Sequence, residues 1–233
     1  MATAGKMMTR HVQLLAALLA TEMVRPLMAK VDAAARAFSA IFFVLVLVAV
    51  FRAVFDTRQR RLVGWILGGI TVALNLADTL APAAWQPAME ILISLSAAAF
   101  FAFVLFVILD HVFGARTLRM DDIVGAFSGY IIIGVIWGRL YVTAWLLAPD
   151  YFSINPEIKW QLGNWNMLHA LFDYYSFTTI STIGYGDITT TGPATNTLVW
   201  LEVMCGQFYL AVVVATIVGI KMSQALAAPR DGG

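Results

Sequence analysis

The stretch TTISTIGYGDITT, residues 178–190, places two glycines around a tyrosine, with threonines on both sides, inside a strongly apolar chain. Glycines at positions 184 and 186 oppose both helix and strand, because ordering glycine costs more backbone entropy than ordering any other residue. Irregular backbone at membrane depth is tolerated only where it is buried in protein or lines a water-filled path. The stretch is therefore either a glycine-rich external turn or the lining of a pore.

The rest of the chain has the composition of an integral membrane protein. Of its 233 residues, 61% are hydrophobic and 12% are charged, whereas a soluble domain is close to half apolar and a quarter charged. The formal net charge of +1 gives no indication of nucleic-acid binding. The single cysteine excludes an intrachain disulfide, and the three histidines show no metal-ligand spacing.

Several apolar runs are long enough, or nearly so, to cross a bilayer, which takes about twenty apolar residues in a helix. They cover residues 38–55, 62–80, 88–113, 124–148 and 196–220. A further run, 11–29, is interrupted by Glu22, Arg25 and Pro26. We expect this run to span the membrane too; a cleaved signal peptide and an external interfacial helix are the alternatives.

Arginines indicate how these helices run through the membrane, because cytoplasmic loops are enriched in Lys and Arg. The arginines that follow the runs 38–55 and 88–113 are Arg58, Arg60, Arg61, Arg116 and Arg119. Both loops are therefore expected in the cytoplasm, with residues 149–195 outside. We predict a multi-pass protein of the cell inner (plasma) membrane whose N- and C-termini are cytoplasmic.

A short apolar and aromatic run, MLHALFDYYSF at residues 167–177, precedes the opening stretch and is too short to cross a membrane. It predicts a re-entrant helix that descends from the outside, with Asn164 or Asn166 as its N-cap. The negative end of its dipole would face the membrane centre, which favours a cation there. In the extended return, Gly184 and Gly186 permit positive φ, so successive carbonyls can point to one side.

The sequence TIGYGD at residues 182–187, between a short helix and an apolar one, resembles the selectivity-filter signature of the potassium channel superfamily. The resemblance covers about residues 124–222. It implies that K⁺ is the permeant ion, with no other cofactor, and that backbone carbonyls and one threonine hydroxyl coordinate it. The implied site residues are Thr182, Ile183, Gly184, Tyr185 and Gly186 for the ion, with Tyr174, Tyr175 and Asp187 in support. Thr178 stands where some bacterial members have a buried glutamate, so that carboxyl cannot pair with Asp187.

One filter sequence per chain implies a homotetramer in the lipid bilayer, because a fourfold ring needs four filters. The expected fold is an all-α integral membrane protein. Residues 1–120 would form four peripheral transmembrane helices, and residues 121–225 a pore domain of outer helix, re-entrant pore helix with selectivity filter, and inner helix. Residues 226–233 would form a short cytoplasmic tail, too short for a cytoplasmic ligand-binding domain. The peripheral helices lack arginines at every third position, so strong voltage gating is not expected.

Gly206 occupies the place of the hinge glycine in the inner helix of the family. Close packing of the inner helix against the pore helix explains a glycine there equally well. Val213 and Ile217 follow on the same helical face as Gly206. We take Gly206, Val213 and Ile217 as hinge and gate candidates; contact with lipid is the other reading of this face.

Two charges lie at similar depth within the last two spans, Arg139 in one and Glu202 in the other. An unpaired charge at that depth costs at least about 2.5 kcal/mol. We expect Arg139 and Glu202 to form an ion pair, within or between subunits. The alternatives are that Arg139 snorkels outward, that Glu202 is protonated, or that Glu202 bonds to the pore helix.

Together these features predict a potassium-selective channel that conducts K⁺ passively through one central pore. The chain shows no Ser, His and Asp set at catalytic spacing, so we expect no enzyme activity. Two alternatives stay open at this point. One is a non-selective monovalent cation channel of the same architecture, and the other is a non-conducting membrane subunit or a membrane enzyme.

Overall fold

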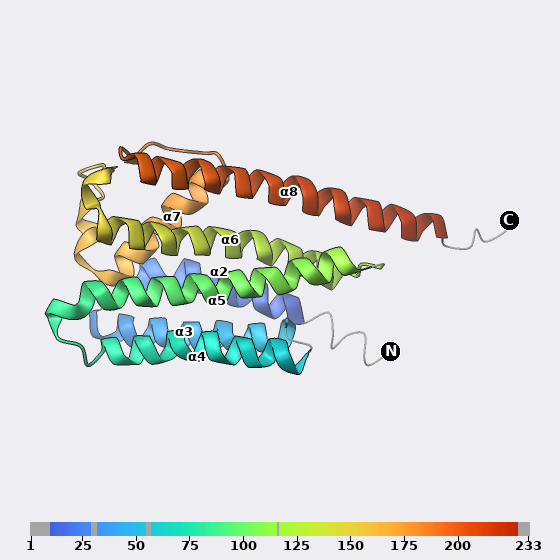
Figure 1. Cartoon of the computed structure of the whole chain (residues 1–233), viewed down its shortest axis with the longest axis horizontal. Coiled ribbons are helices and arrows are strands. Elements are labelled where there is room, and N and C mark those ends of the chain that lie inside the picture. Colours follow the sequence, from blue (N-terminus) through green and yellow to red (C-terminus); the bar gives the residue numbers. More distant parts are fainter. Residues whose placement is uncertain (1–9, 29–31, 55–56, 116, 228–233) are drawn as a thin grey trace.

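The computed structural model describes residues 10–28, 32–54, 57–115 and 117–227, and leaves side chains from 28 to 42 undescribed. Over these residues the protein is built of long helices with one small sheet (Figure 1). The α-helices are α2 (Arg10–Met28), α3 (Asp32–Ala53), α4 (Arg58–Asp78), α5 (Gln86–Gly114), α6 (Met120–Leu147), α7 (Trp165–Ile180) and α8 (Pro193–Ala227). Short 3-10 turns are η1 (Ala83–Trp85), η2 (Pro149–Tyr151) and η3 (Lys159–Gly163). Of the expected tail, residues 228–233 lie outside the described residues.

Four of the described helical segments are long and apolar enough to cross a membrane: Arg58–Asp78, Ala83–Gly114, Met120–Leu147 and Pro193–Leu226. They coincide with four of the runs read from the sequence, and the chain is an all-α membrane protein as predicted. Helix α2 occupies the run 11–29 but does not meet the same criterion. The described apolar part of α3, Phe43–Ala53, is short.

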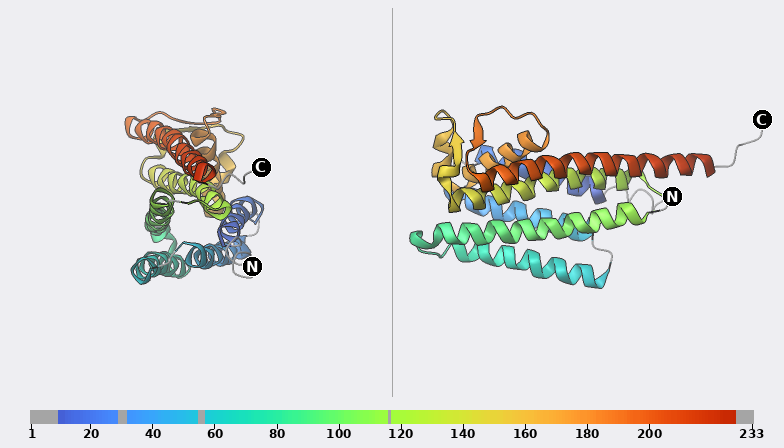
Figure 2. Two further views of the ribbon diagram at one scale, coloured as in Figure 1. Left: turned by 90° about the vertical axis from the view of Figure 1, so that its right-hand side faces the viewer. Right: turned by 45° about the horizontal axis from the view of Figure 1, so that its top comes forward.

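Helices α2 to α6 form a ring. Each helix from α2 to α5 packs against the next helix in the chain, and α2 also packs against α6, which closes the ring (Figure 2). Helix α6, which the sequence assigns to the pore domain, is thus itself one wall of the ring. The ring also reaches the pore helix, because α2 packs against α7.

Local chemistry marks where these helices begin. Thr57 caps α4 by accepting a hydrogen bond from the amide of Arg60 at 3.3 Å. At the start of α6 the Asp122 carboxylate accepts one from the amide of Arg119 at 2.7 Å. Such side chains satisfy amides that have no partner within the helix, and the acidic charge favours the positive end of the helix dipole.

Close approach of α7 to α6 depends on two glycines of α6. A side chain at Gly134 would collide with the ring of Phe177, and one at Gly138 would collide with the Asp173 carboxylate. Small residues allow membrane helices to pack with their backbones close together. The sequence of α6 therefore places the short helix α7 directly against it.

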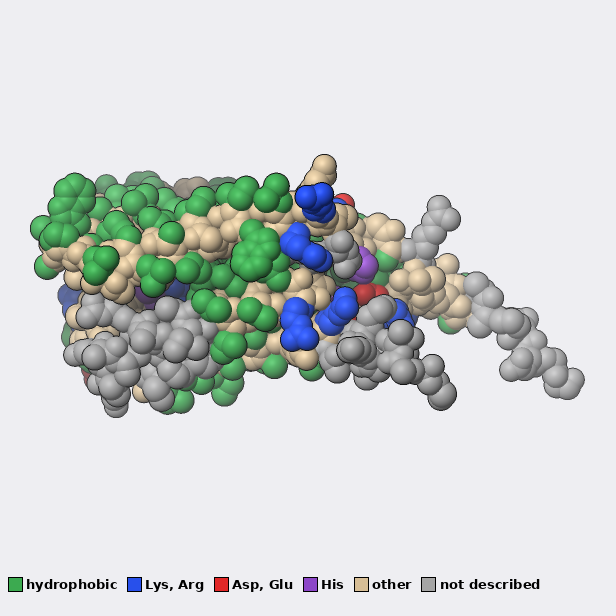
Figure 3. Space-filling view, turned by 90° about the horizontal axis from the view of Figure 1, so that it is seen from below, with side chains coloured by type: hydrophobic (Ala, Val, Ile, Leu, Met, Phe, Trp, Pro, Cys, Tyr) green, Lys and Arg blue, Asp and Glu red, His purple; other side chains and the backbone are tan. Residues whose placement is uncertain are grey.

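Charge and apolar surface are segregated along the molecule. Figure 3 shows apolar side chains along one long face, with most of the Lys and Arg side chains in view lying toward the end where α2 begins and α8 ends. Helix α7 and the segment that follows it lie toward the opposite end (Figure 1). The proposed direction of insertion, with the basic end in the cytoplasm, stays a prediction from the distribution of Lys and Arg.

Candidate functional site

Helix α7 begins at a side-chain cap and ends where the TIGYGD segment starts. The side-chain oxygen Oδ1 of Asn164 accepts hydrogen bonds from the amides of Asn166 at 2.9 Å and Met167 at 3.3 Å. Asn164, rather than Asn166, is therefore the N-cap. The helix ends at Ile180, with Ser181 as its C-cap.

The segment after α7 has an alternating backbone. Gly184 and Gly186 have φ of 53° and 78°, as the sequence predicts, and Thr182 has φ of 62°. Positive φ is uncommon for any residue other than glycine and is rarest for β-branched ones, so Thr182 was not foreseen. Positive φ thus recurs at every second residue, and this alternation turns successive carbonyls toward one side.

Hydrogen bonds show which way this backbone faces. The amides of residues 183 and 184 donate to the carbonyl of Thr178 at 2.9 and 3.1 Å. The amide of Thr182 donates to the carbonyl of Thr179 at 2.9 Å. The carbonyls of residues 182–186 accept no hydrogen bond from any described residue. The N–H groups are therefore directed at the end of α7, while a row of carbonyl oxygens is left without a protein donor.

The same segment is exposed in the single chain. Ile183 is 55% exposed and Tyr185 is 70% exposed, although the last turn of α7 behind them is buried. A row of unpaired carbonyls on an exposed side can bind a dehydrated cation once other oxygens complete its shell.

Tyr174 and Asp187 brace the outer end of this segment. The Tyr174 hydroxyl donates to the Asp187 carboxylate at 2.7 Å, and its ring stacks on that of Tyr185 with centroids 6.4 Å apart. Asp187 therefore has a partner in Tyr174. Tyr175 is buried and lies edge-on to Tyr141 at 4.8 Å, behind the segment.

The predicted Arg139–Glu202 ion pair is wrong. Arg139 of α6 donates to the Asp173 carboxylate and to His169, both on α7. Glu202 of α8 contacts Tyr141 and Ser176 instead. Equal depth alone did not bring the two charges together, because α7 offers each a nearer partner. The alternative in which Glu202 bonds to the pore helix is confirmed by its contact with Ser176.

The hydrogen bonds around Glu202, which is fully buried, favour a protonated carboxyl group. The Ser176 hydroxyl lies 2.7 Å from the Gly134 carbonyl, which has no proton to donate, so Ser176 donates there. Its close contact with Glu202 then needs a proton from the carboxyl group. The other carboxyl oxygen accepts from the Tyr141 hydroxyl at 2.6 Å. The neutral carboxyl group links α6, α7 and α8 in one bonded cluster.

The assignment of Val213 and Ile217 to a gate is also corrected. Val213 is buried in the hydrophobic core of the protomer, and Ile217 packs against that core. On the same helix, the Tyr209 hydroxyl donates a hydrogen bond to the Ala126 carbonyl of α6. A side chain at Gly206 would collide with Ile180, the last residue of α7. This face of α8 therefore packs within the protomer, and the packing role of Gly206 is the one that the structure supports.

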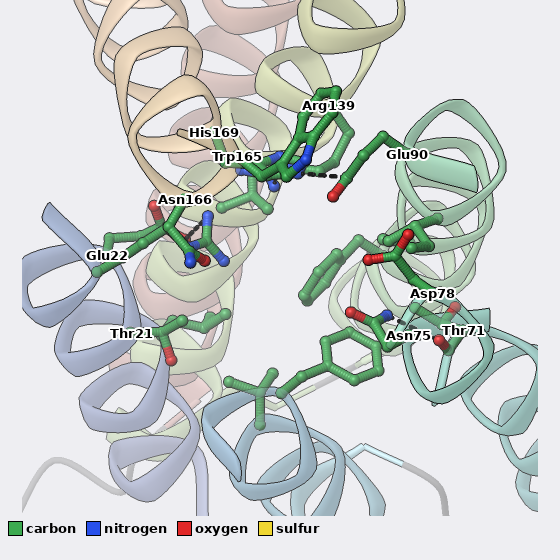
Figure 4. Close-up of a pocket in the computed structure, with 18 of the residues that line it drawn as sticks. Thr21, Glu22, Thr71, Asn75, Asp78, Glu90, Arg139, Trp165, Asn166 and His169 are labelled. Carbon is green, nitrogen blue, oxygen red and sulfur yellow. Dashed lines mark hydrogen bonds and ion pairs between the residues drawn. The ribbon is translucent and has the colours of Figure 1, made fainter. Parts of the chain in front are cut away.

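A cluster of charged side chains, which sequence reasoning missed, surrounds Asp173 in the middle of α7. Arg25 of α2 donates to the Asp173 carboxylate at 2.6 Å, and His169 lies 3.0 Å from Glu90 of α5. These residues flank a cavity of about 470 Å³ inside the ring (Figure 4). The sequence did contain a sign of this cluster, because several charged residues lie in otherwise apolar helices. Charged residues within membrane helices are usually paired or functional.

Comparisons with known proteins match the C-terminal part of the chain. Residues 126–223 match a family model described as "Ion channel". The chain is 37% identical over 87 residues to the inward rectifier potassium channel Kirbac3.1 of Paramagnetospirillum magnetotacticum. The matched part is 37% of this chain and 28% of that protein, so the chain covers less than a third of its relative. No solved structure matches the chain significantly.

Proposed function

We propose that this chain, whose residues 126–223 match the ion channel family model, is a member of the potassium channel superfamily that assembles as a homotetramer and conducts K⁺ passively. The observation that carries the proposal is the row of carbonyls at residues 182–185. The amides of residues 182–184 donate to the last turn of α7, and the carbonyl oxygens have no donor among the described residues. Carbonyl oxygens arranged in this way replace the water shell of a monovalent cation.

The exposed side of this filter supports assembly around a fourfold axis. One chain supplies one wall of a filter, and a closed ring of identical walls is the symmetric way to surround an ion. Helix α8 supports the same arrangement, since it buries only a narrow stripe against its own protomer. Its exposed apolar residues at four-residue spacing are Leu210, Val214, Val218 and Met222. We propose that this stripe lines the inner part of the pore.

The proposed channel lies in the cell inner (plasma) membrane with both termini in the cytoplasm. The distribution of Lys and Arg supports this direction of insertion. It holds K⁺ at the carbonyls of residues 182–185 and the Thr182 hydroxyl, and it is not strongly voltage-gated. The match to an ion channel family model and the similarity to a potassium channel support a conducting role rather than an enzymatic one.

Uptake of radioactive Rb⁺ into liposomes that contain the purified protein tests conduction. We expect uptake driven by an outward K⁺ gradient, blocked by external Ba²⁺, from protein that chemical cross-linking shows to be a tetramer. Equal uptake of Na⁺ would favour a non-selective channel. Protein-free and protein-containing liposomes that behave alike would favour a non-conducting subunit.

A further inference from the structure

We propose that Asp173 of α7 is a positioning residue for ion selection, and that Arg25 of the peripheral helix α2 holds it in place together with Arg139. Helix α2 is then part of the support of the filter. The proposal rests on the K⁺ conduction proposed above.

Asp173 lies between two helices. One of its carboxylate oxygens accepts from Arg25 of α2 at 2.6 Å and from Arg139 of α6. Its side chain is only 3% exposed, and the carboxylate sits directly against Gly138 of α6. A buried carboxylate that accepts from two guanidinium groups has a strongly restricted position, because charge-assisted hydrogen bonds are short and directional.

A second contact holds α7 one turn nearer its N-terminus. Arg139 also donates to Nδ1 of His169, and arginine has no acceptor, so that nitrogen carries no proton. The other ring nitrogen, Nε2, then bears the proton and donates to Glu90 of α5 at 3.0 Å. Helix α7 is therefore fixed at two levels by α2, α5 and α6, which sets both its rotation and its depth.

The position of α7 determines the position of the filter, because the two are directly bonded. Tyr174, the residue after Asp173, donates to Asp187 and stacks on Tyr185. The carbonyls at the other end of α7 receive the filter amides. A rotation of α7 that displaces Asp173 therefore moves Tyr174 and the filter wall together. Because ion selection depends on the arrangement of the carbonyls, it depends on this anchor.

Charge, and not close packing alone, fixes α2 at this depth. Described residues of α2, α4 and α5 line the cavity of about 470 Å³ inside the ring (Figure 4). Glu22, also on α2, lies 3.9 Å from Arg25 and faces this cavity. Loss of Arg25 leaves Asp173 with Arg139 as its one remaining arginine partner, so the buried carboxylate is held by one guanidinium group instead of two.

The test is the K⁺/Na⁺ permeability ratio, from reversal potentials of the full-length channel in planar bilayers. We expect Arg25→Gln and Asp173→Asn to lower this ratio at least about tenfold, which corresponds to about 1.4 kcal/mol. Arg25→Lys keeps the charge and should retain most of the wild-type ratio. Arg60→Gln is the matched control, since it breaks an ion pair between α4 and α5 that does not touch α7.

A purely structural role for Arg25 would change the tetramer yield or melting temperature and leave the ratio unchanged. An unchanged ratio in both Arg25→Gln and Asp173→Asn, with a selective wild type, overturns the inference and leaves the proposed function standing. A wild type without K⁺ selectivity overturns both. If Arg25→Gln subunits do not assemble by themselves, they are combined with excess wild-type subunits in mixed tetramers. We expect these mixed tetramers to show a lowered K⁺/Na⁺ permeability ratio. A wild-type ratio in the mixed tetramers also overturns the inference.

Discussion

At the scale of single residues, Glu202 acts as a neutral hydrogen-bonding group. It accepts a hydrogen bond from Tyr141 and, when protonated, donates one to Ser176, and glutamine can do both. We therefore expect Glu202→Gln to change the stability of the tetramer by less than about 1 kcal/mol. Glu202→Ala leaves two hydroxyls without their partner and opens a cavity, which should cost about 2–4 kcal/mol. Thermal unfolding in detergent compares the variants, and equal damage from both would show that the carboxyl is ionised.

Gly184 is a filter residue whose backbone conformation disfavours a side chain. Its φ of 53° lies in the left-handed region, which costs an L-residue roughly 1–2 kcal/mol. We expect Gly184→Ala to abolish selective K⁺ flux, measured as Rb⁺ uptake against Na⁺ uptake. Gly69→Ala is the control, because Gly69 lies on α4 with nothing within 4 Å of an added Cβ. Normal selectivity in Gly184→Ala would contradict the filter assignment.

At the scale of elements, the orientation of α8 makes a prediction about the pore wall. Val214 is 53% exposed, whereas its neighbour Val213 is 4% exposed against the protomer core. In a background where the single cysteine is removed by Cys205→Ser, we expect Val214→Cys to react with a charged, membrane-impermeant thiol reagent. The reaction should block the current, and Val213→Cys should stay unmodified. Faster modification of Val213→Cys would reverse the proposed rotation of the helix.

The same elements show how far sequence could lead. The short helix α7, a cap at Asn164 or Asn166 and the positive φ of the filter glycines follow from local rules, and the sequence predicts them. The partners of Arg139 do not follow from local rules. They depend on the tertiary packing, in which α7 contacts both α6 and α8 and offers partners to Arg139 and Glu202. The apolar run that becomes α7 gave no sign that Asp173 would meet Arg25 across the ring. Helical spacing likewise defines a face of α8 but not the direction in which that face points.

At the scale of the whole molecule, the arrangement of charge predicts weak voltage dependence. No helix of the ring carries arginines at every third position in its sequence. Each elementary charge that crosses the membrane contributes about 2.3 kcal/mol per 100 mV, so a steep response needs several such charges. We expect a shallow conductance–voltage curve from single-channel recording. A curve as steep as that of a dedicated voltage-gated channel would mean that the ring moves several charges through the membrane field.

The reversal potential of the reconstituted channel, with K⁺ on one side of a bilayer and Na⁺ on the other, tests the central claim most directly. The carbonyl row at residues 182–185 predicts a current that reverses far toward the K⁺ equilibrium potential, because those oxygens replace the shell of K⁺. A reversal potential near zero would show that K⁺ and Na⁺ pass alike, and would contradict a potassium-selective filter in this chain.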